Sequence, residues 1–325
     1  MSLFTICVAV IIISFLIILK ANKIGNFFNL VDYPSQLKNH KSPTPMLGGL
    51  IIILNLICSF FFSKYLGEET VNFFLLSYIF SFFLIGLVDD IFDLKSTYKL
   101  LLVIFISCCF IIFQENFIIE KLYFSITNNN FYFGSFKFVV TIVCVLLLYI
   151  AFNMADGINC LLITFSLFSI FIYKFIIIGN TSLDLVSIII LLSLSIIFYY
   201  NYCEKIFLGN SGASLLAGYF IYVLISENFI SNIDVFQVIS IPLIMGIDMI
   251  RIFFERISNK KNIFKRDNNH FHHILQRNFN FFNSILIYLL LSFFPILFSR
   301  LLKIETLFLI PFSVVIYFLL IKNFK

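Results

Sequence analysis

Long apolar runs alternate with short polar segments along almost the whole chain. The hydrocarbon core of a membrane is about 30 Å thick, and a helix needs about 20 apolar residues to cross it. Runs of that kind lie at 2–20, 46–63, 71–88, 98–114, 137–153, 161–179, 183–200, 212–226, 234–254, 284–299 and 304–321. The pattern predicts an all-α polytopic membrane protein with about 11 transmembrane helices. No soluble segment interrupts it, so residues 1–325 are expected to form a single membrane domain.

The composition supports the same class of protein. Hydrophobic residues make up 61% of the 325 positions, charged residues only 12%, and the mean hydropathy is +1.04. Soluble domains are closer to half apolar and a quarter charged, so this surplus predicts a surface that faces lipid. Residues 1–20 lack a basic start and a small-residue cleavage site, which favours a first span over a removed signal. The seven cysteines show no metal-binding spacing and are expected as apolar core residues.

The distribution of Lys and Arg predicts the orientation in the membrane. With the segment 20–45 inside and the spans alternating, the inside segments hold 16 of these residues and the outside segments 6. This bias predicts an external N-terminus and an internal C-terminus. The net charge of +5 includes no long basic run outside one loop, which argues against nucleic-acid binding. One outside connection, 115–136, has two β-prone runs around an Asn-rich turn and predicts a short external β-hairpin near 118–135.

Three carboxylates follow the third apolar run on the predicted inside face, at Asp89, Asp90 and Asp93. If this segment is helical, the spacings of three and four residues let all three converge on one side. Clustered carboxylates repel one another unless a cation lies among them, and Mg²⁺ prefers oxygen ligands that it shares with substrate phosphates. The alternative is a solvated acidic loop at a membrane boundary.

Two further inside segments carry polar groups suited to a nucleotide sugar. Asn153, Asp156 and Asn159 surround a flexible glycine, and their oxygens suit a metal, a base edge or sugar hydroxyls. The segment 207–214, Phe-Leu-Gly-Asn-Ser-Gly-Ala-Ser, combines small residues with a helix start, where backbone N–H groups can approach an anion. A plain Asx-rich turn and a common Gly/Ser helix entry are the alternatives, and the same holds for Pro-Thr-Pro-Met-Leu-Gly-Gly at 43–49.

All four histidines of the chain lie in the predicted inside loops. Basic residues beside a membrane are often simple topology signals, but this does not account for His270, His272 and His273 within four positions. A zinc site would need cysteine or more acidic ligands, so hydrogen-bond donors to a diphosphate are the better interpretation. Two charges inside spans have simpler readings: Asp248 is expected to pair with the nearby Arg251, and Lys174 to snorkel outward.

Taken in order, these segments resemble the polyprenyl-phosphate N-acetylhexosamine-1-phosphate transferase family, that is, glycosyltransferase family 4. The order is D-x-P, K-x-H, P-T-P-x-x-G-G, D-D-x-x-D, N-x-x-D-G-x-N, F-L-G-x-S-G and H-x-H-H, from residue 32 to residue 273. The D-D-x-x-D and H-F-H-H forms look closer to the WecA/TagO-like branch than to the peptidoglycan branch. The family's architecture of roughly eleven spans and an external hairpin agrees with the pattern above.

The resemblance implies a reaction and a set of residues. The donor would be a UDP-N-acetylhexosamine and the acceptor undecaprenyl phosphate, with release of UMP, at the cytoplasmic face of a bacterial inner membrane. The cofactor would be Mg²⁺ or Mn²⁺, held by Asp89, Asp90, Asp156 and Asn210. The catalytic carboxylates would be Asp89, Asp90 and Asp93. The substrate-binding residues would be Lys38, His40, Asn153, Asp156, Asn159, His270, His272 and His273.

Two positions depart from the family pattern. The family usually has Asp where this chain has Asn210, which still offers an amide oxygen but no charge, so metal affinity should fall. It also prefers Gly where this chain has Cys160. A catalytically weak member that acts as an assembly partner is therefore one alternative. A membrane transporter is another, although it predicts an inverted repeat and polar residues at mid-membrane. The sugar, the glycan pathway, and the choice between monomer and homodimer stay open.

Overall fold

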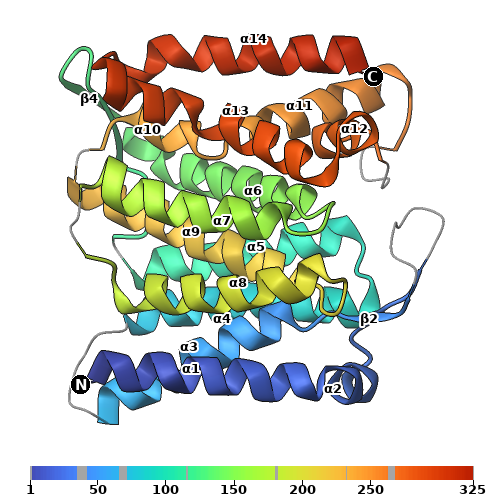
Figure 1. The fold of residues 1–325 in the computed structure, drawn as a ribbon. Helices are drawn as coiled ribbons and strands as arrows, with labels where there is room; N and C mark the ends of the chain where they lie inside the picture. Colours follow the sequence, from blue (N-terminus) through green and yellow to red (C-terminus); the bar gives the residue numbers. More distant parts are fainter. Residues whose placement is uncertain are drawn as a thin grey trace. The chain divides into compact units, whose positions relative to one another are not determined.

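The structure is a computed structural model, and it describes residues 2–34, 42–65, 72–114, 116–179, 182–231, 233–262 and 268–324. Its contacts divide the chain into two compact units. Unit 1 comprises Met1–Phe110 and Asn159–Tyr222, and unit 2 comprises Ile111–Ile158 and Val223–Lys325. Both units are built almost wholly from helices (Figure 1).

Seven helices in the described residues are long and apolar enough to cross a membrane. They are α3 (Gly48–Tyr65), α4 (Phe73–Phe92), α5 (Ser96–Phe113), α6 (Lys137–Ala155), α8 (Leu185–Tyr202), α13 (Phe281–Leu302) and α14 (Thr306–Phe324). The helices α1 (Ser2–Leu19) and α2 (Ala21–Phe28) form an eighth candidate, bent by 71° between them. Helices satisfy every backbone polar group internally, which lipid requires. The prediction of an all-α polytopic membrane protein is confirmed.

The other predicted runs are also helical, but shorter or interrupted. The run at 161–179 forms α7 (Leu161–Phe171) and the π-helical turn η2 (Ile172–Ile177). The run at 212–226 lies within α9 (Gly209–Ser231), whose first turn is polar. The run at 234–254 is broken into α10 (Val235–Ser240) and α11 (Leu243–Ser258), with Pro242 at the break. Proline cannot donate a backbone hydrogen bond, so it favours a helix start at that point.

The predicted hairpin is present in unit 2. Strand β3 (Lys121–Phe124) pairs antiparallel with β4 (Asn129–Tyr132), and residues 125–128 form the turn. Asn128 closes the turn in the left-handed conformation, with φ 51°, which asparagine tolerates better than most residues. Asn129 and Asn130, predicted in the turn, belong to β4 instead. The short helix η1 (Gly134–Phe136) then leads into α6.

Polar contacts join three helices inside unit 1. Asn55 of α3 donates from Nδ2 to Ser14 Oγ of α1 at 2.8 Å and to Ser193 Oγ of α8 at 2.9 Å. All three side chains are fully buried. Small hydroxyl and amide groups let transmembrane helices approach closely and bond across their interface. This cluster therefore fixes how α1, α3 and α8 pack together (Figure 1).

Lys174 does not snorkel outward as the sequence suggested. Its side chain is buried in unit 1, and Nζ lies 3.0 Å from Asp184 Oδ1 at the start of α8. The reason is the π-helical turn η2, which contains Lys174. A π-turn inserts an extra residue into the helical repeat and so redirects the side chains around it.

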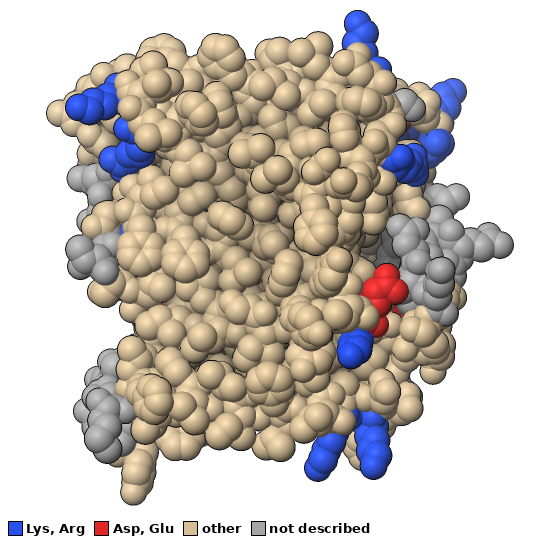
Figure 2. Space-filling model, viewed as in Figure 1, with Lys and Arg blue, Asp and Glu red and all other residues tan. Residues whose placement is uncertain are grey.

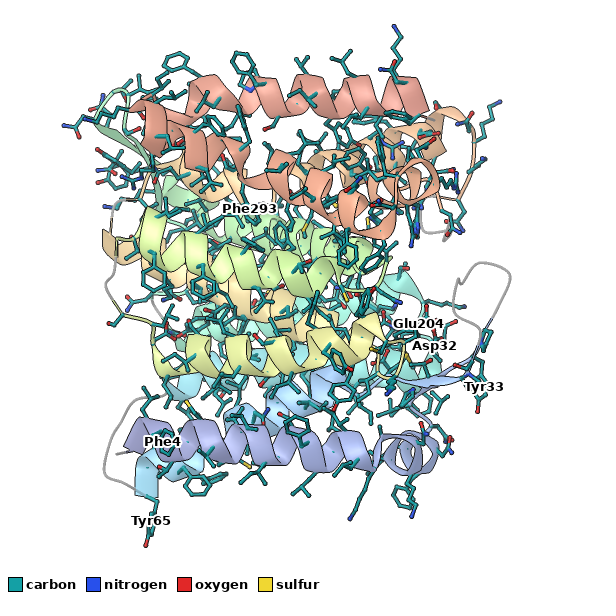
Figure 3. All side chains as sticks on the ribbon, in the orientation of Figure 1. Phe4, Asp32, Tyr33, Tyr65, Glu204 and Phe293 are labelled. Atoms are coloured by element: carbon teal, nitrogen blue, oxygen red, sulfur yellow. The ribbon has the colours of Figure 1, made fainter. Side chains whose placement is uncertain are left out.

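Apolar side chains cover the outer surfaces of the helices. Phe4 and Tyr65, labelled in Figure 3, are 73% and 88% exposed. In the face drawn in Figure 2, uncharged residues cover the helix surfaces, and the Lys and Arg side chains lie toward the helix ends. Apolar surface of this extent is unfavourable in water but is expected for helices that contact lipid. The protein is a multi-pass membrane protein.

Candidate active site

In unit 1, the carboxylates predicted to be catalytic lie at the C-terminal end of α4. Asp89 is buried, and its Oδ2 forms an ion pair with Lys99 Nζ in the first turn of α5. Its Oδ1 accepts the Leu94 backbone N–H at 3.0 Å. In the sequence analysis, Lys99 counted only as one of the Lys and Arg residues that predict the orientation in the membrane. Its place one turn into the next helix, ten residues after Asp89, is the signal by which it could have been assigned to this site.

Asp90 holds the start of α9. Its Oδ1 accepts the Asn210 N–H at 2.8 Å, and its Oδ2 accepts the Ser211 N–H at 2.9 Å. The first N–H groups of a helix have no partner within it, and a carboxylate there is also favoured by the helix dipole. Gly209 precedes them with φ 76°, a left-handed conformation that favours glycine. Asp90 thus joins the motif at 86–93 to the motif at 207–214.

Asp93 departs from the predicted convergence of three carboxylates. Helix α4 ends at Phe92, and Asp93 is its exposed C-cap, in the left-handed conformation with φ 46°. The helical spacing that would bring Asp93 beside Asp89 therefore does not apply to it. Within the described residues, no three His, Cys, Asp or Glu side chains are grouped so that they could hold a metal ion.

Backbone contacts explain the two glycine-containing motifs. A Cβ on Gly86 of α4 would overlap the backbone of Asn210 and Ser211, so only glycine allows α4 and α9 to lie this close. The segment at 43–49 pairs with the segment at 207–214: Phe207 N–H donates to Pro45 O at 2.9 Å, and Gly48 N–H donates to Phe207 O at 3.0 Å. These motifs build the framework under Asp90.

Two short strands on either side of residues 35–41 adjoin the same framework. Strand β1 (Val31–Asp32) pairs with β2 (Thr44–Pro45), which places Asp32 opposite Thr44. Thr44 Oγ1 donates to the Glu204 carbonyl oxygen at 3.2 Å. Asp32 and Glu204 are labelled together beside these strands in Figure 3. Lys38 and His40, predicted to bind substrate, lie outside the described residues.

Asn159 and Cys160 lie in the turn before α7, in unit 1. Asn159 is half-buried there. Cys160 has φ 62° and donates its N–H to Asn201 Oδ1 at 2.7 Å. Glycine adopts this left-handed conformation without steric cost, whereas other residues are strained. This left-handed backbone is a physical reason for the family to prefer glycine at the position of Cys160.

In unit 2, the other residues of this predicted motif surround the end of α6. Asn153 donates from Nδ2 to Tyr149 O, one turn back, at 2.9 Å. Asp156 is the half-buried C-cap of α6. A Cβ on the next residue, Gly157, would overlap the imidazole of His272. The motif at 153–159 is therefore in direct contact with the histidine motif, because the absent side chain of Gly157 leaves room for His272.

The three histidines at the start of α12 (Phe271–Asn278) lie side by side in unit 2. The rings of His270 and His272 lie parallel, with centroids 5.5 Å apart, and the centroids of His272 and His273 are 4.3 Å apart. His272 is buried, and its Nε2 has no hydrogen-bond partner within the described residues. Burial lowers the pKa of His272 well below its usual value, and the neighbouring His273 and His270 lower it further. His272 is therefore neutral at pH 7.

Comparison with known proteins identifies the relatives of this chain. Residues 72–228 match the sequence model of glycosyl transferase family 4. This range contains Asp89, Asp90, Asp156 and Asn210. Over this range the chain is similar to glycosyl transferase family 4. The histidine motif at 270–273 lies beyond the matched range.

Individual relatives match most of the chain. An undecaprenyl-phosphate alpha-N-acetylglucosaminyl 1-phosphate transferase of Thermotoga maritima is 29% identical over 281 residues, which cover 85% of this chain and 83% of that protein. The protein of the same name from Escherichia coli (strain K12) is 24% identical over 288 residues, which cover 83% of this chain and 75% of that protein. The resemblance inferred from the motifs, including the WecA-like branch, is confirmed.

Proposed function

We propose that this protein transfers N-acetylhexosamine 1-phosphate from a UDP-sugar to undecaprenyl phosphate, releases UMP and so starts a cell-envelope glycan. The relatives named above suggest UDP-N-acetylglucosamine as the first donor to test. The observation that carries the proposal is the pair Asp89 and Asp90, fixed by α5 and α9 within the family-matched range. The proposed location is the cytoplasmic face of a bacterial inner membrane, in line with the Lys and Arg bias.

The reaction is a phosphoryl transfer between two anions. An oxygen of the lipid phosphate forms a bond to the sugar-bearing phosphorus of the donor, and the bond from that phosphorus to the oxygen shared with UMP breaks. Catalysis of this kind depends on bringing the two anions together in line and stabilising charge on the phosphate oxygens. Polar groups held rigidly before the substrate binds are most effective, because they need not reorganise during the reaction.

Asp89 and Asp90 are well placed for different parts of this task. Asp90 is immobilised by two backbone N–H groups at the start of α9, which suits a group that must keep a fixed position. Asp89 is buried beside Lys99, whose ammonium group can attract a phosphate. One of these carboxylates would position or deprotonate the lipid phosphate. In unit 2, His270, His272 and His273 would contact phosphate oxygens, and Asn153 and Asp156 the nucleotide.

Mg²⁺ suits the chemistry of the donors in unit 1. Asp89, Asp90 and the half-buried Asn210 offer carboxylate and amide oxygens. Mg²⁺ is usually held by one or two carboxylates, with water and substrate phosphates completing its shell, so a three-residue cage is not required. When bound, it would neutralise charge on the donor diphosphate. Mn²⁺ accepts the same oxygen ligands and is the alternative ion in this proposal.

The experiment is UMP release by purified protein given undecaprenyl phosphate, Mg²⁺ and a panel of UDP-N-acetylhexosamines. We expect release that needs the lipid, stops with EDTA, and is lost in Asp89→Asn. The matched control is Asp184→Asn, which makes the same chemical change at the ion pair of an exposed carboxylate with the buried Lys174 and should keep activity. If folded protein releases no UMP with any donor of the panel, while a related enzyme is active in the same assay, the proposal is contradicted. If Asn210→Asp then released UMP, the inactivity of the natural sequence would be due to a weakened metal site.

A further inference from the structure

Asp248 of α11 is a buried acceptor for four different groups of unit 2. Its Oδ1 accepts from Arg251 Nη2 and from the Tyr317 hydroxyl, both at 2.8 Å. Its Oδ2 lies 2.9 Å from His270 Nδ1. The Phe271 backbone N–H lies 3.1 Å from Oδ1 and 3.2 Å from Oδ2. The sequence predicted the pair with Arg251, and this is confirmed, but the contact with His270, 22 residues away, was not predicted.

These contacts fix both the backbone and the ring of His270. His270 is the N-cap of α12, yet its own side chain makes no capping bond. Asp248 supplies that bond from another helix, by accepting the Phe271 N–H. Arg251 adds a second tie to the same segment, because its Nη2 donates to the Asn269 carbonyl oxygen at 2.6 Å. The start of the histidine helix is thus held by α11.

The carboxylate also decides which nitrogen of His270 is available. An ionised carboxylate only accepts hydrogen bonds, so Nδ1 must be the protonated nitrogen facing Asp248. Nε2 is then the only ring nitrogen left for another molecule, as a proton acceptor when the ring is neutral and a donor when it is charged. A carboxylate that orients an imidazole in this way is a common feature of catalytic and metal-binding histidines.

We infer that Asp248 is a positioning residue, which fixes the tautomer and direction of His270 so that Nε2 faces a phosphate oxygen of the substrate. The inference rests on the proposed function of the histidine motif. It assigns no contact between Asp248 and the substrate, since the two carboxylate oxygens already accept from four groups of the protein. Tyr317 and Arg251 hold Asp248 through Oδ1, whereas His270 Nδ1 lies beside Oδ2.

The first test is spectroscopic and does not depend on activity. The chain has four histidines, so ¹⁵N-histidine labelling gives few ring signals, and His270→Gln assigns one of them. In Asp248→Asn, the amide oxygen should take the Oδ1 position, where Arg251 and Tyr317 donate, and its NH₂ should face Nδ1. The His270 signal should therefore change from protonated to unprotonated Nδ1. An unchanged signal in folded Asp248→Asn would overturn the inference.

The second test is a double-mutant cycle on UMP release. Asp248→Asn should lower kcat/KM about tenfold or more, which is the usual effect of mutating the hydrogen-bond partner of a functional histidine. In the His270→Gln background, the same change should lower it less than about twofold, because the residue acts through His270. Thermal stability, by contrast, should fall in both backgrounds, since the caps on α12 are lost in each. A further tenfold loss of kcat/KM in the double variant would overturn the inference.

Two additional variants keep the test decisive. Asp184→Asn, the same change at the ion pair with Lys174 in unit 1, should leave kcat/KM within about twofold, and an equal loss there would mean the effect is not specific. If Asp248→Asn does not fold, Asp248→Glu keeps the charge and should retain the protonated Nδ1 signal with more activity than His270→Gln. Less activity than His270→Gln would refute the assignment. Wild-type UMP release is measured alongside, so failure of the proposed function is recognised separately.

Discussion

Asp90→Asn tests whether this carboxylate holds helix α9 in place, apart from any part it has in catalysis. In the wild type, each carboxylate oxygen accepts one backbone N–H, from Asn210 at 2.8 Å and from Ser211 at 2.9 Å. An asparagine side chain has nearly the same shape but only one acceptor oxygen. Its NH₂ group must therefore face one of the two N–H donors, whichever way the amide is turned.

The size of the effect follows from these two bonds. A hydrogen bond to a charged group contributes about 1.5–3 kcal/mol, and one of the two is lost. Removing a negative charge from a helix N-terminus costs a further 0.3–1 kcal/mol, roughly. Part of this sum is offset because the neutral amide is easier to bury than a carboxylate. We expect a net loss of about 2 kcal/mol in the free energy of unfolding.

The assay is thermal unfolding of the purified variants in the same detergent. For a chain of this length, about 2 kcal/mol corresponds to a fall in Tm on the order of 4 °C. The matched control is Glu120→Gln, the same carboxylate-to-amide change in the partly exposed pair with Lys137, where the loss should stay below about 1 kcal/mol. Activity does not discriminate, because Asp90 is also proposed to take part in the reaction. An Asp90→Asn protein as stable as the wild type would refute the assignment of Asp90 as the cap of α9.

Three other predictions concern the remaining parts of the site. Gly157→Ala should lower kcat/KM at least tenfold, because the added Cβ would displace the buried His272 ring. The control is Gly246→Ala, which should be tolerated because the space around its Cβ is open. Equal activity of the two variants would contradict the contact between Gly157 and His272. The low pKa of His272 means that the unfolded chain binds more protons below pH 6.5, so stability should fall as pH drops from 7 toward 5, by up to about 1.4 kcal/mol per unit. Denaturation at several pH values should show a shallower fall in His272→Gln; an identical slope would exclude His272 as its source. Asn210→Asp should lower the Mg²⁺ concentration needed for half-maximal UMP release, and an unchanged requirement would argue that this side chain does not reach the metal.

Several features of the fold could be predicted from the sequence because they depend on local pattern and solvent. Each long apolar run became helical, since lipid offers no partner for an unpaired backbone group. The β-prone runs around the Asn-rich turn formed the hairpin β3–β4, because the turn and its neighbouring strands are contiguous in the chain. The motifs for the family were likewise visible as residue types at fixed spacings.

Other features were not visible because their causes lie elsewhere in the chain. Asp93 left the helical face since α4 ends one residue before it, and helix ends depend on capping contacts. Lys174 turned inward because a π-helical turn redirected it toward Asp184. Neither change alters the apolar pattern from which the spans were predicted, so neither could be anticipated from it.

The sequence by itself therefore determined the class of protein, the helices, the hairpin and the residues capable of chemistry. Tertiary structure decided which of these residues depend on one another. Asp90 caps a helix 120 residues further along the chain, Gly157 makes room for His272, and Asp248 orients His270. Hydropathy and spacing report only on neighbours along the chain, whereas these partnerships depend on which helices lie within hydrogen-bond distance after packing.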